Sequence, residues 1–279
     1  MGRARQLRDQ AIDLMSAGLE AVTDRRYSRP PFCEAPLASR SEYLRLWAEA
    51  RRVSYPEVDR YEQECDAAVD PDWFHQLALL TQVVIKESAI CYQHGRLLYA
   101  TLVRYTRQRA CHHLTIVETG TARGFSALCL ARALHDVGAT GKIVSFDVVP
   151  HDLKILWNCV ADADGPRTRA TLLESYAELM ERYLIFHRGD TKRELAKLSF
   201  PRVNLAFLDS VHSYDHVMAE FASIGDHQAT GDIVFFDDYT PEAYPGVVKA
   251  ADEICLSHGY SKNVIVCGDA RQYLIAVKK

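Results

Sequence analysis

From Leu114 onward, short apolar runs alternate with amphipathic stretches, and this alternation constrains the fold more than any other feature of the chain. Seven runs have the length and composition of strands: 114–118, 142–147, 184–187, 203–209, 232–237, 261–267 and 272–278. Helical patterns fill the gaps between the first six runs, over 124–137, 171–182, 192–197, 214–226 and 244–258. Strands that alternate with helices form βαβ units around a parallel sheet. We therefore predict an α/β fold with a doubly wound, mostly parallel seven-stranded sheet.

The direction of the strands follows from their burial and their connections. The first five runs are nearly continuous in apolar residues, as expected for strands that helices cover on both faces. The last two runs are joined by a short loop at Gly268-Asp269. So short a loop cannot cross over the sheet, because parallel neighbours need a connection of a dozen or more residues. We therefore expect the last strand to run antiparallel.

The N-terminal part of the chain has a different, helical texture. Helical spacing of apolar residues extends over 3–21, Ser41 is placed to cap a helix through Val53, and Asp70-Pro71 is placed to begin one that runs toward Ser88. A further helix is predicted over 94–108. We divide the chain into a helical N-terminal arm or lid over residues 1–90 and a Rossmann-like domain over residues 91–279. The arm either caps the domain or mediates self-association, or it closes over a pocket as a lid.

Composition excludes several classes of protein. The net charge is −4 and no basic stripe is present, so a nucleic acid is not the expected partner. The longest helical apolar stretch, 76–85, is too short to span a membrane. The start of the chain, MGRARQLRDQ, has no apolar run of the kind that a secretory signal needs. The eight cysteines are scattered without metal-binding spacing, which is typical of reduced thiols in a cytoplasmic protein.

The turn after the first strand carries the first candidate binding motif. It reads Glu118-x-Gly120-x-x-x-Gly124, with Ala122 where a dinucleotide fold places its middle glycine. A pyrophosphate needs that glycine for close approach, so a dinucleotide is not favoured. Glu118 would also repel a phosphate and attract a cation such as an α-amino group. The alternative is that the glycines serve only a tight strand-to-helix turn.

The next two strand ends carry polar residues as well. Asp147 ends the second strand, where an acidic side chain can accept hydrogen bonds from both ribose hydroxyls. Gly189-Asp190 follows the third strand, and Asp190 either bonds a base amino group or caps the next helix. Ligands of such sheets lie at the carboxyl ends of the strands, so these residues are candidates for one site.

The fourth and fifth strand ends are strongly acidic. Asp209 and His212 follow the fourth strand, and Asp237-Asp238 follows the fifth. Carboxylates at this density repel one another unless a cation neutralises them, and oxygen ligands suit Mg²⁺, Mn²⁺ or Ca²⁺. His212 is a candidate general base. The alternatives are solvated loop acids and a structural histidine.

In this order, the motifs resemble those of class I S-adenosyl-L-methionine-dependent methyltransferases. The resemblance is closest to the metal-dependent O-methyltransferases of antibiotic and macrolide-sugar tailoring, a branch that includes proteins named after cephalosporin hydroxylase. It covers about residues 90–279, with DSVHSY at 209–214 and FFDDY at 235–239 as its more specific parts. Related proteins often carry Glu before Asp in the acidic pair, whereas this chain has Asp237, whose shorter side chain changes the geometry offered to a metal.

The resemblance implies a role for each candidate residue. Glu118 and Gly120 would line the methionine part of the cofactor, Asp147 the ribose and Asp190 the adenine. Further cofactor contacts are expected from Thr121, Gly124, Gly189 and Asp209. Mg²⁺, or Mn²⁺ or Ca²⁺ in its place, would be held by Asp209, Asp237 and Asp238, with His212 as the base. Tyrosines near these strand ends, Tyr214, Tyr239 and Tyr244, are candidates for the wall of the acceptor pocket, with Tyr92 and His94 opposite them.

The implied function is methyl transfer to a hydroxyl of a small molecule such as a sugar, a phenol or a natural product. No nucleic acid or membrane is expected as partner, and a homo-oligomer is. Two alternatives from other classes stay open at this point. A nicotinamide-dependent oxidoreductase would want a glycine at Ala122, and a non-catalytic cofactor-binding or assembly module would bind the cofactor without turnover. A nucleic-acid methyltransferase is disfavoured because 209–212 lacks the Pro-Pro signature of amino-methylating enzymes.

Overall fold

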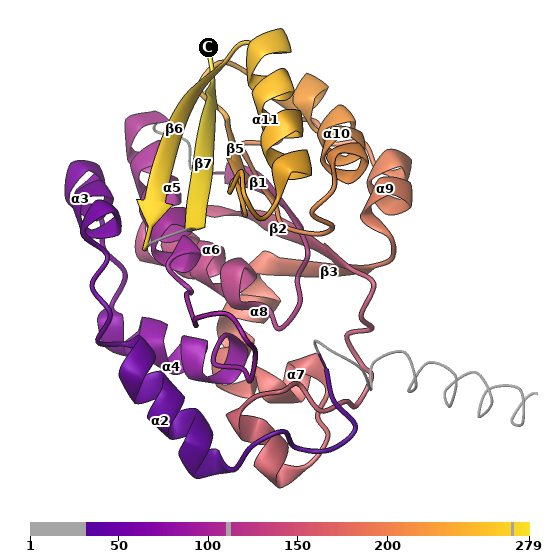
Figure 1. Cartoon of the computed structure of the whole chain (residues 1–279). Coiled ribbons are helices and arrows are strands. Elements are labelled where there is room, and N and C mark those ends of the chain that lie inside the picture. Colours follow the sequence, from indigo (N-terminus) through magenta and orange to yellow (C-terminus); the bar gives the residue numbers. More distant parts are fainter. Residues whose placement is uncertain (1–31, 110–112, 269–270) are drawn as a thin grey trace, which may run out of the picture.

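A seven-stranded sheet forms the centre of the molecule (Figure 1). The computed structural model describes residues 32–109, 113–268 and 271–279. The strands are β1 (His113–Thr119), β2 (Thr140–Asp147), β3 (Leu184–Arg188), β4 (Leu205–Leu208), β5 (Ile233–Phe236), β6 (Tyr260–Cys267) and β7 (Arg271–Lys278). They lie in the order β3-β2-β1-β4-β5-β7-β6. The pairs among β1 to β5 are parallel, whereas β7 runs antiparallel to both β5 and β6. Both predictions, the mostly parallel sheet and the antiparallel last strand, are confirmed.

Burial along the strands follows their position in the sheet. Every residue of β4 and β5 is buried, because these central strands are covered on both faces. The edge strand β6 instead leaves Val264 and Val266 partly exposed. The apolar runs found in the sequence therefore mark the centre of the sheet.

Helices cover both faces of the sheet (Figure 1). One face carries α5 (His94–Arg109), α6 (Phe125–Asp136) and α8 (Ala177–Tyr183), and the other carries α9 (Thr191–Glu194), α10 (Tyr214–Ala222) and α11 (Pro245–Ser257). The segment between β2 and β3 is broken into η1 (Val160–Asp164), α7 (Arg169–Leu172), η2 (Glu174–Tyr176) and α8, where the sequence predicted one helix. Short 3₁₀ turns also follow α9 and α10, as η3 (Leu195–Lys197) and η4 (Gly225–His227).

The N-terminal helices differ in detail from the sequence prediction. Helix α2 (Arg40–Ala50) is capped by Ser39 and not by Ser41, since the Ser39 hydroxyl accepts the N–H of Glu42. Helix α4 (Pro71–Thr81) begins as predicted, with Asp70 accepting the N–H of Trp73, but ends well before Ser88. Helix α3 (Pro56–Cys65) was missed because its sequence is mostly polar. The helix predicted over 3–21 lies outside the described residues.

These helices pack against the rest of the molecule. Helix α3 lies against α5 and β6, while α2 and α4 lie against η1. Within the ranges that the structure describes, no helix combines the length and apolar character needed to cross a bilayer.

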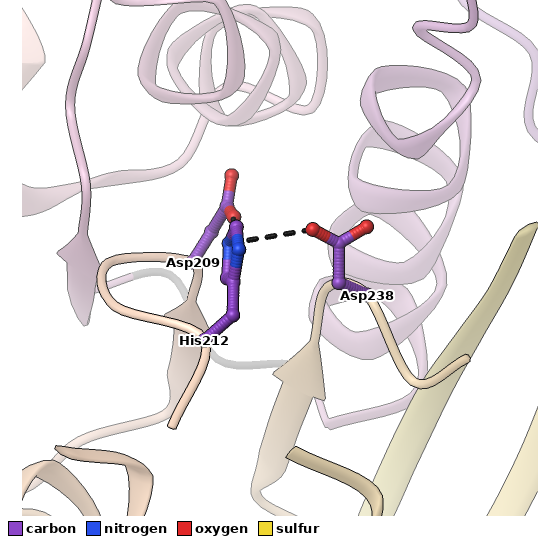
Figure 2. A group of neighbouring side chains, drawn as sticks. All are labelled: Asp209, His212 and Asp238. Carbon is purple, nitrogen blue, oxygen red and sulfur yellow. Dashed lines mark hydrogen bonds and ion pairs between the residues drawn. The ribbon is translucent and has the colours of Figure 1, made fainter. Parts of the chain in front are cut away.

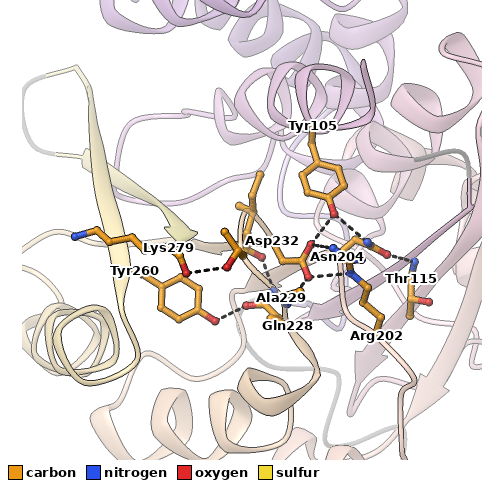
Figure 3. A network of polar contacts seen from close by, with 11 residues as sticks. Tyr105, Thr115, Arg202, Asn204, Gln228, Ala229, Asp232, Tyr260 and Lys279 are labelled. Atoms are coloured by element: carbon orange, nitrogen blue, oxygen red, sulfur yellow. Dashed lines mark hydrogen bonds and ion pairs between the residues drawn. The ribbon is translucent and has the colours of Figure 1, made fainter. Parts of the chain in front are cut away.

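A buried polar network ties together the amino ends of three parallel strands (Figure 3). The Asp232 carboxylate, fully buried just before β5, accepts the Tyr105 hydroxyl at 2.6 Å, the Arg202 guanidinium at 2.8 and 3.0 Å, and the Ala229 N–H at 2.7 Å. Asn204, just before β4, donates to the Tyr105 hydroxyl and accepts the N–H of Thr115 in β1. The network joins α5 to the sheet at the edge opposite the predicted site.

We expect Asp232→Ala to lower the free energy of unfolding by about 3 kcal/mol, because it leaves a buried hydroxyl, a backbone N–H and a guanidinium without their acceptor. Urea unfolding measures the change. Asp226→Ala, at an exposed acidic residue of η4, is the matched control and is expected to stay within about 0.5 kcal/mol of the unmutated chain. Equal effects of the two substitutions would contradict a stabilising role for the network.

Candidate active site at the carboxyl ends of the strands

The turn from β1 into α6 is set by close packing against β4. Gly120, Ala122 and Gly124 all have positive φ, of 88°, 45° and 89°. A Cβ on Gly120 would lie 1.9 Å from the Asp209 carbonyl oxygen, so only glycine fits between the ends of β1 and β4. Ala122, the residue in place of a middle glycine, thus adopts a left-handed conformation that is uncommon for alanine.

Glu118 lies beneath this turn and is fully buried. Its two carboxylate oxygens accept the hydroxyls of Ser126 in α6 and Ser145 in β2, and Ser145 lies 2.5 Å from the Thr121 hydroxyl. Burial raises the pKa of Glu118 to about 7, and the two serine hydroxyls oppose this rise. Glu118 therefore joins β1, β2 and α6 under the candidate cofactor site.

Asp147 at the end of β2 is held by backbone groups. Its Oδ2 accepts the N–H of Ala122 at 2.5 Å and its Oδ1 accepts the N–H of Val149 at 2.7 Å. Burial raises its pKa, while the Arg169 guanidinium at 3.7 Å lowers it. The carboxylate thus bridges the ends of β1 and β2, and each oxygen keeps a lone pair for a further donor.

Arg169 is a residue of the site that sequence reasoning missed. It is buried, donates from Nε to the Ala122 carbonyl at 2.8 Å, and lies over the rings of Trp157 and Phe186. It therefore fixes the turn after β1 from the β2–β3 segment. No motif marked it, because the helix predicted from the sequence began only at residue 171, and a single arginine before it is typical of a surface position.

Gly189 and Asp190 follow β3. The Gly189 N–H bonds to the Asp147 carbonyl at 2.8 Å, which brings the ends of β2 and β3 together. Asp190 stands at the N-cap position of α9, but its side chain makes no capping hydrogen bond and is exposed. The side-chain capping alternative for Asp190 therefore finds no support, and its carboxylate is open to a ligand.

The ends of β4 and β5 bring together Asp209, His212 and Asp238 (Figure 2). The His212 Nε2 lies 3.2 Å from Oδ1 of Asp209 and 3.3 Å from Oδ2 of Asp238. One ligand atom from each of the three residues lies within 4.8 Å of the others. The edge of the Tyr244 ring lies against the His212 imidazole, with ring centroids 4.6 Å apart.

Asp237 faces another partner. Its Oδ2 pairs with the Arg271 guanidinium of β7 at 3.1 Å, and the same nitrogen lies 2.8 Å from Asp238 Oδ1. The sequence predicted Asp209, Asp237 and Asp238 as metal ligands. In the structure, the ligand atoms that converge belong to Asp209, His212 and Asp238. Arg271 was not anticipated, because only the antiparallel pairing of β7 with β5 brings it beside the acidic pair.

The acidic residues perturb each other strongly. Burial and the charge of Asp237 raise the pKa of Asp209 well above its usual range. Burial lowers the pKa of His212, but the hydrogen bond with Asp209 and the neighbouring carboxylates outweigh this and raise it overall. Lys86, from the segment after α4, adds a positive charge beside Asp238 and Arg271, and burial lowers its pKa. The positive charges of Lys86 and Arg271 and the His212 imidazole thus offset the negative charge of the three aspartates.

A second buried carboxylate, missed in the sequence, supports the loop after β4. Glu220 of α10 accepts the hydroxyls of Thr119 at 3.2 Å, Thr191 at 2.5 Å, and Ser210. It therefore links the ends of β1 and β4 to the start of α9. The sequence feature that could have identified Glu220 is its position among the apolar residues on the buried face of this helix, between Val217 and Phe221.

The aromatic residues suggested as pocket walls separate into two groups. Tyr244 contacts His212, whereas the Tyr214 hydroxyl donates to Glu253 and the Tyr239 hydroxyl to Asp252. Tyr92 is fully buried among aromatic rings. His94 is also buried, which lowers its pKa to about 4, and its ring stacks on Phe207 of β4.

Part of the chain matches a known family. Residues 117–239, from β1 to the loop after β5, match the family model described as a methyltransferase domain. No curated protein matches the chain. The matched span holds every residue proposed from the sequence to bind cofactor or metal.

Solved structures share the fold. Cofactor-bound Rv0187 from MTB superposes with a TM-score of 0.53 at 17% identity, over 75% of this chain and 90% of that one. The O-methyltransferase TomG from Streptomyces achromogenes gives 0.51 at 18% identity, over 76% and 92%. The O-methyltransferase NovP gives 0.51 at 16% identity, over 70% and 83%.

We expect Gly120→Ala to cost more than about 2 kcal/mol of unfolding free energy and to abolish cofactor binding, since the new Cβ meets the Asp209 carbonyl. Gly138→Ala is the matched control, because Gly138 also has positive φ but has open space around its Cβ position. It is expected to cost about 1 kcal/mol, the conformational strain alone, and to leave binding intact. Denaturant unfolding and calorimetry measure the two effects, and equal losses would argue against the packing constraint.

The raised pKa of Glu118 predicts a pH-dependent stability. The folded state holds the Glu118 proton more tightly than the unfolded state, so the unfolding free energy falls as pH rises from about 4.5 to about 7. We expect Glu118→Gln to lack this fall and to gain up to about 3 kcal/mol relative to the unmutated chain between those pH values. Ser126→Ala, which removes a donor to the carboxylate, is expected to extend the fall to higher pH. Identical pH profiles of the three proteins in urea unfolding would contradict the assignment.

Proposed function

We propose that this chain, an S-adenosylmethionine-dependent methyltransferase, methylates a hydroxyl of a small molecule and that His212 removes the hydroxyl proton. The observation that carries the proposal is the position of His212, whose Nε2 lies between the carboxylates of Asp209 and Asp238. The backbone of Asp209 in turn touches Gly120 in the β1–α6 turn. The proposed base and the proposed cofactor turn therefore lie side by side at the carboxyl ends of β1 and β4.

The cofactor site is proposed along the ends of β1 to β4. Asp147 keeps lone pairs for ribose hydroxyls, and the exposed Asp190 carboxylate is placed to accept an adenine amino group. Further proposed contacts are Glu118, Gly120, Thr121, Gly124, Gly189 and Asp209. S-adenosylmethionine supplies a methyl group on a sulfonium, an already activated donor. The structure of TomG, which shares the fold, is described as in complex with SAM.

The carboxylates give His212 a defined orientation. The Nε2 proton is shared between Asp209 and Asp238. Nδ1 is then the nitrogen that takes the proton from the hydroxyl of the methyl acceptor. The two carboxylates also stabilise the imidazolium that results. Tyr244 holds the ring from its edge.

A divalent cation is the second element of the proposal. Asp209, His212 and Asp238 provide two carboxylates and an imidazole within one coordination sphere, a donor set that Mn²⁺ or Mg²⁺ accepts. When bound, the ion would lower the pKa of the acceptor hydroxyl. Asp237 is not a member of this group of converging ligand atoms, and its Oδ2 pairs with Arg271. Nε2 of His212 cannot both bind the ion and carry a proton, so metal ligation and the base role compete.

The segment after α4 is proposed to lie beside the binding site of the methyl acceptor. Both backbone polar groups of Ile85 bond to the Asn158 side chain, which anchors this segment to the β2–β3 connection. Lys86 follows directly and feels the charge of Asp238. These contacts support the proposal that the last part of the arm predicted over residues 1–90 acts as a lid on the domain predicted over 91–279.

The acceptor class rests on chemistry and on similar proteins. NovP and TomG are both described as O-methyltransferases, TomG as involved in tomaymycin synthesis. This favours a sugar, a phenol or another natural-product hydroxyl. Membership of the branch that includes proteins named after cephalosporin hydroxylase, self-association and a cytoplasmic location stay predictions.

Release of S-adenosylhomocysteine from S-adenosylmethionine, with a panel of phenols and sugars, tests the function. We expect His212→Ala to lower turnover by about 10²-fold or more while its affinity for S-adenosylhomocysteine stays near that of the unmutated enzyme. His216→Ala is the matched control, since His216 pairs with Ser213 outside the acidic group. Full activity of His212→Ala would refute the base.

The same assay after EDTA treatment tests the metal. A loss of activity that Mg²⁺ or Mn²⁺ restores is the expected result. Unchanged turnover after EDTA would refute the ion and leave the base assignment standing. No heat of binding with S-adenosylmethionine or its demethylated product would refute the cofactor site.

A further inference from the structure

Two cysteines far apart in the sequence meet beside the acidic site. The sulfur atoms of Cys91 and Cys267 lie 3.4 Å apart, although 176 positions separate them. Cys91 belongs to the segment between α4 and α5, and Cys267 ends β6. Cys267 is the cross-strand partner of Arg271, which pairs with Asp237 and Asp238. The thiol pair therefore sits where the β6–β7 hairpin touches the body of the molecule.

The two thiols have unequal character. A hydrogen bond from the Cys267 thiol, and further ones from the Gln93 N–H and the Tyr273 hydroxyl, lower the pKa of Cys91 to about 6 against the effect of burial. The Arg271 charge acts in the same direction. The bond to Cys91 and burial raise the pKa of Cys267. The contact between the two sulfurs therefore favours the thiolate at Cys91 and the protonated thiol at Cys267.

Access also favours Cys91. Among the cysteines that the structure describes, Cys91 is the one that is only partly buried, and the other six are buried. A small oxidant therefore reaches Cys91 before Cys267, and the Cys267 sulfur lies within contact distance of the Cys91 sulfur. This is the arrangement of a reactive cysteine with a resolving partner.

We propose that Cys91 and Cys267 form a reversible disulfide when the protein meets hydrogen peroxide. The Cys91 thiolate attacks one oxygen of hydrogen peroxide, the O–O bond breaks, and Cys91 becomes a sulfenic acid. The other oxygen leaves as hydroxide, which takes a proton from the solvent and becomes water. The Cys267 sulfur then attacks the Cys91 sulfur, the S–O bond breaks, and the oxygen leaves as water with the Cys267 proton. The two sulfurs supply two electrons, and the peroxide is reduced to two waters.

The bridge would tie the hairpin to the segment before α5. A disulfide needs its sulfurs about 1.4 Å closer than they lie here, a small movement for a hairpin at the edge of the sheet. The link closes a loop of most of the chain, so it restricts the unfolded state strongly. This modification is independent of methyl transfer.

Peptide mapping of the full chain tests the proposal. Reduced protein is treated with equimolar hydrogen peroxide near neutral pH, free thiols are blocked with N-ethylmaleimide, and the protein is digested with trypsin. We expect peptides 87–96 (ESAICYQHGR) and 263–271 (NVIVCGDAR), which hold one cysteine each, to appear joined and to separate on treatment with dithiothreitol. The melting temperature of the oxidised protein is expected to rise by several degrees.

Variants separate the two roles. Cys267→Ser is expected to stop at a Cys91 sulfenic acid that dimedone traps, and Cys91→Ser to remain unoxidised at residue 267. Cys255→Ser, at a buried cysteine of α11, is the matched control and should keep both the joined peptides and the rise in melting temperature. Joined peptides from other cysteines, or oxidation of Cys91 to a sulfinic acid without a bridge in the unmutated chain, would overturn the proposal. Either result leaves the proposed methyl transfer untouched.

Discussion

The site depends on a concentration of negative charge that the chain buries at the ends of β4 and β5. Asp209, Asp237 and Asp238 lie too close together to remain ionised in a dry environment without positive partners. Arg271 offsets Asp237, and His212 lies between the other two carboxylates. This balance explains why an imidazole lies between two carboxylates at the ends of these strands. It also makes the β6–β7 hairpin, which brings Arg271, part of the site.

The proposed cofactor site at the ends of β1 and β2 is instead stabilised by close packing of the backbone. Gly120 lets the end of β1 approach β4, and Asp147 and Arg169 bind the backbone of Ala122 from its N–H and C=O sides. Glu118 fills the space below with an acid that has only hydroxyls as partners. These contacts fix the conformation of the turn from within the chain, and a preorganised turn lowers the entropic cost of binding. Charge pairing thus determines the arrangement of side chains at the ends of β4 and β5, and backbone packing determines the arrangement at the ends of β1 and β2.

Much of this architecture could be predicted. The seven strands were placed within a few residues, because continuous apolar runs such as 203–209 and 232–237 mark strands buried on both faces. Helix α4 was placed by its Asp70-Pro71 start. Polar helix α3 was not found, since its few apolar residues gave no clear period, and the β2–β3 segment was expected to be one helix. Of the candidate residues at the ends of β4 and β5, Asp209, His212 and Asp238 bring their ligand atoms together, and Asp237 pairs with Arg271.

The sequence by itself determined the class of fold, the direction of the last strand and the strand ends at which chemistry is placed. These follow from local pattern, since the period of apolar residues and the length of connections act over a few neighbours. Only the tertiary structure decided which charges meet. Arg271, Arg169 and Glu220 reach the site from segments far away in the chain, and the contact between Cys91 and Cys267 joins residues 176 positions apart. Such contacts depend on strand order and helix packing, which no short window of sequence contains.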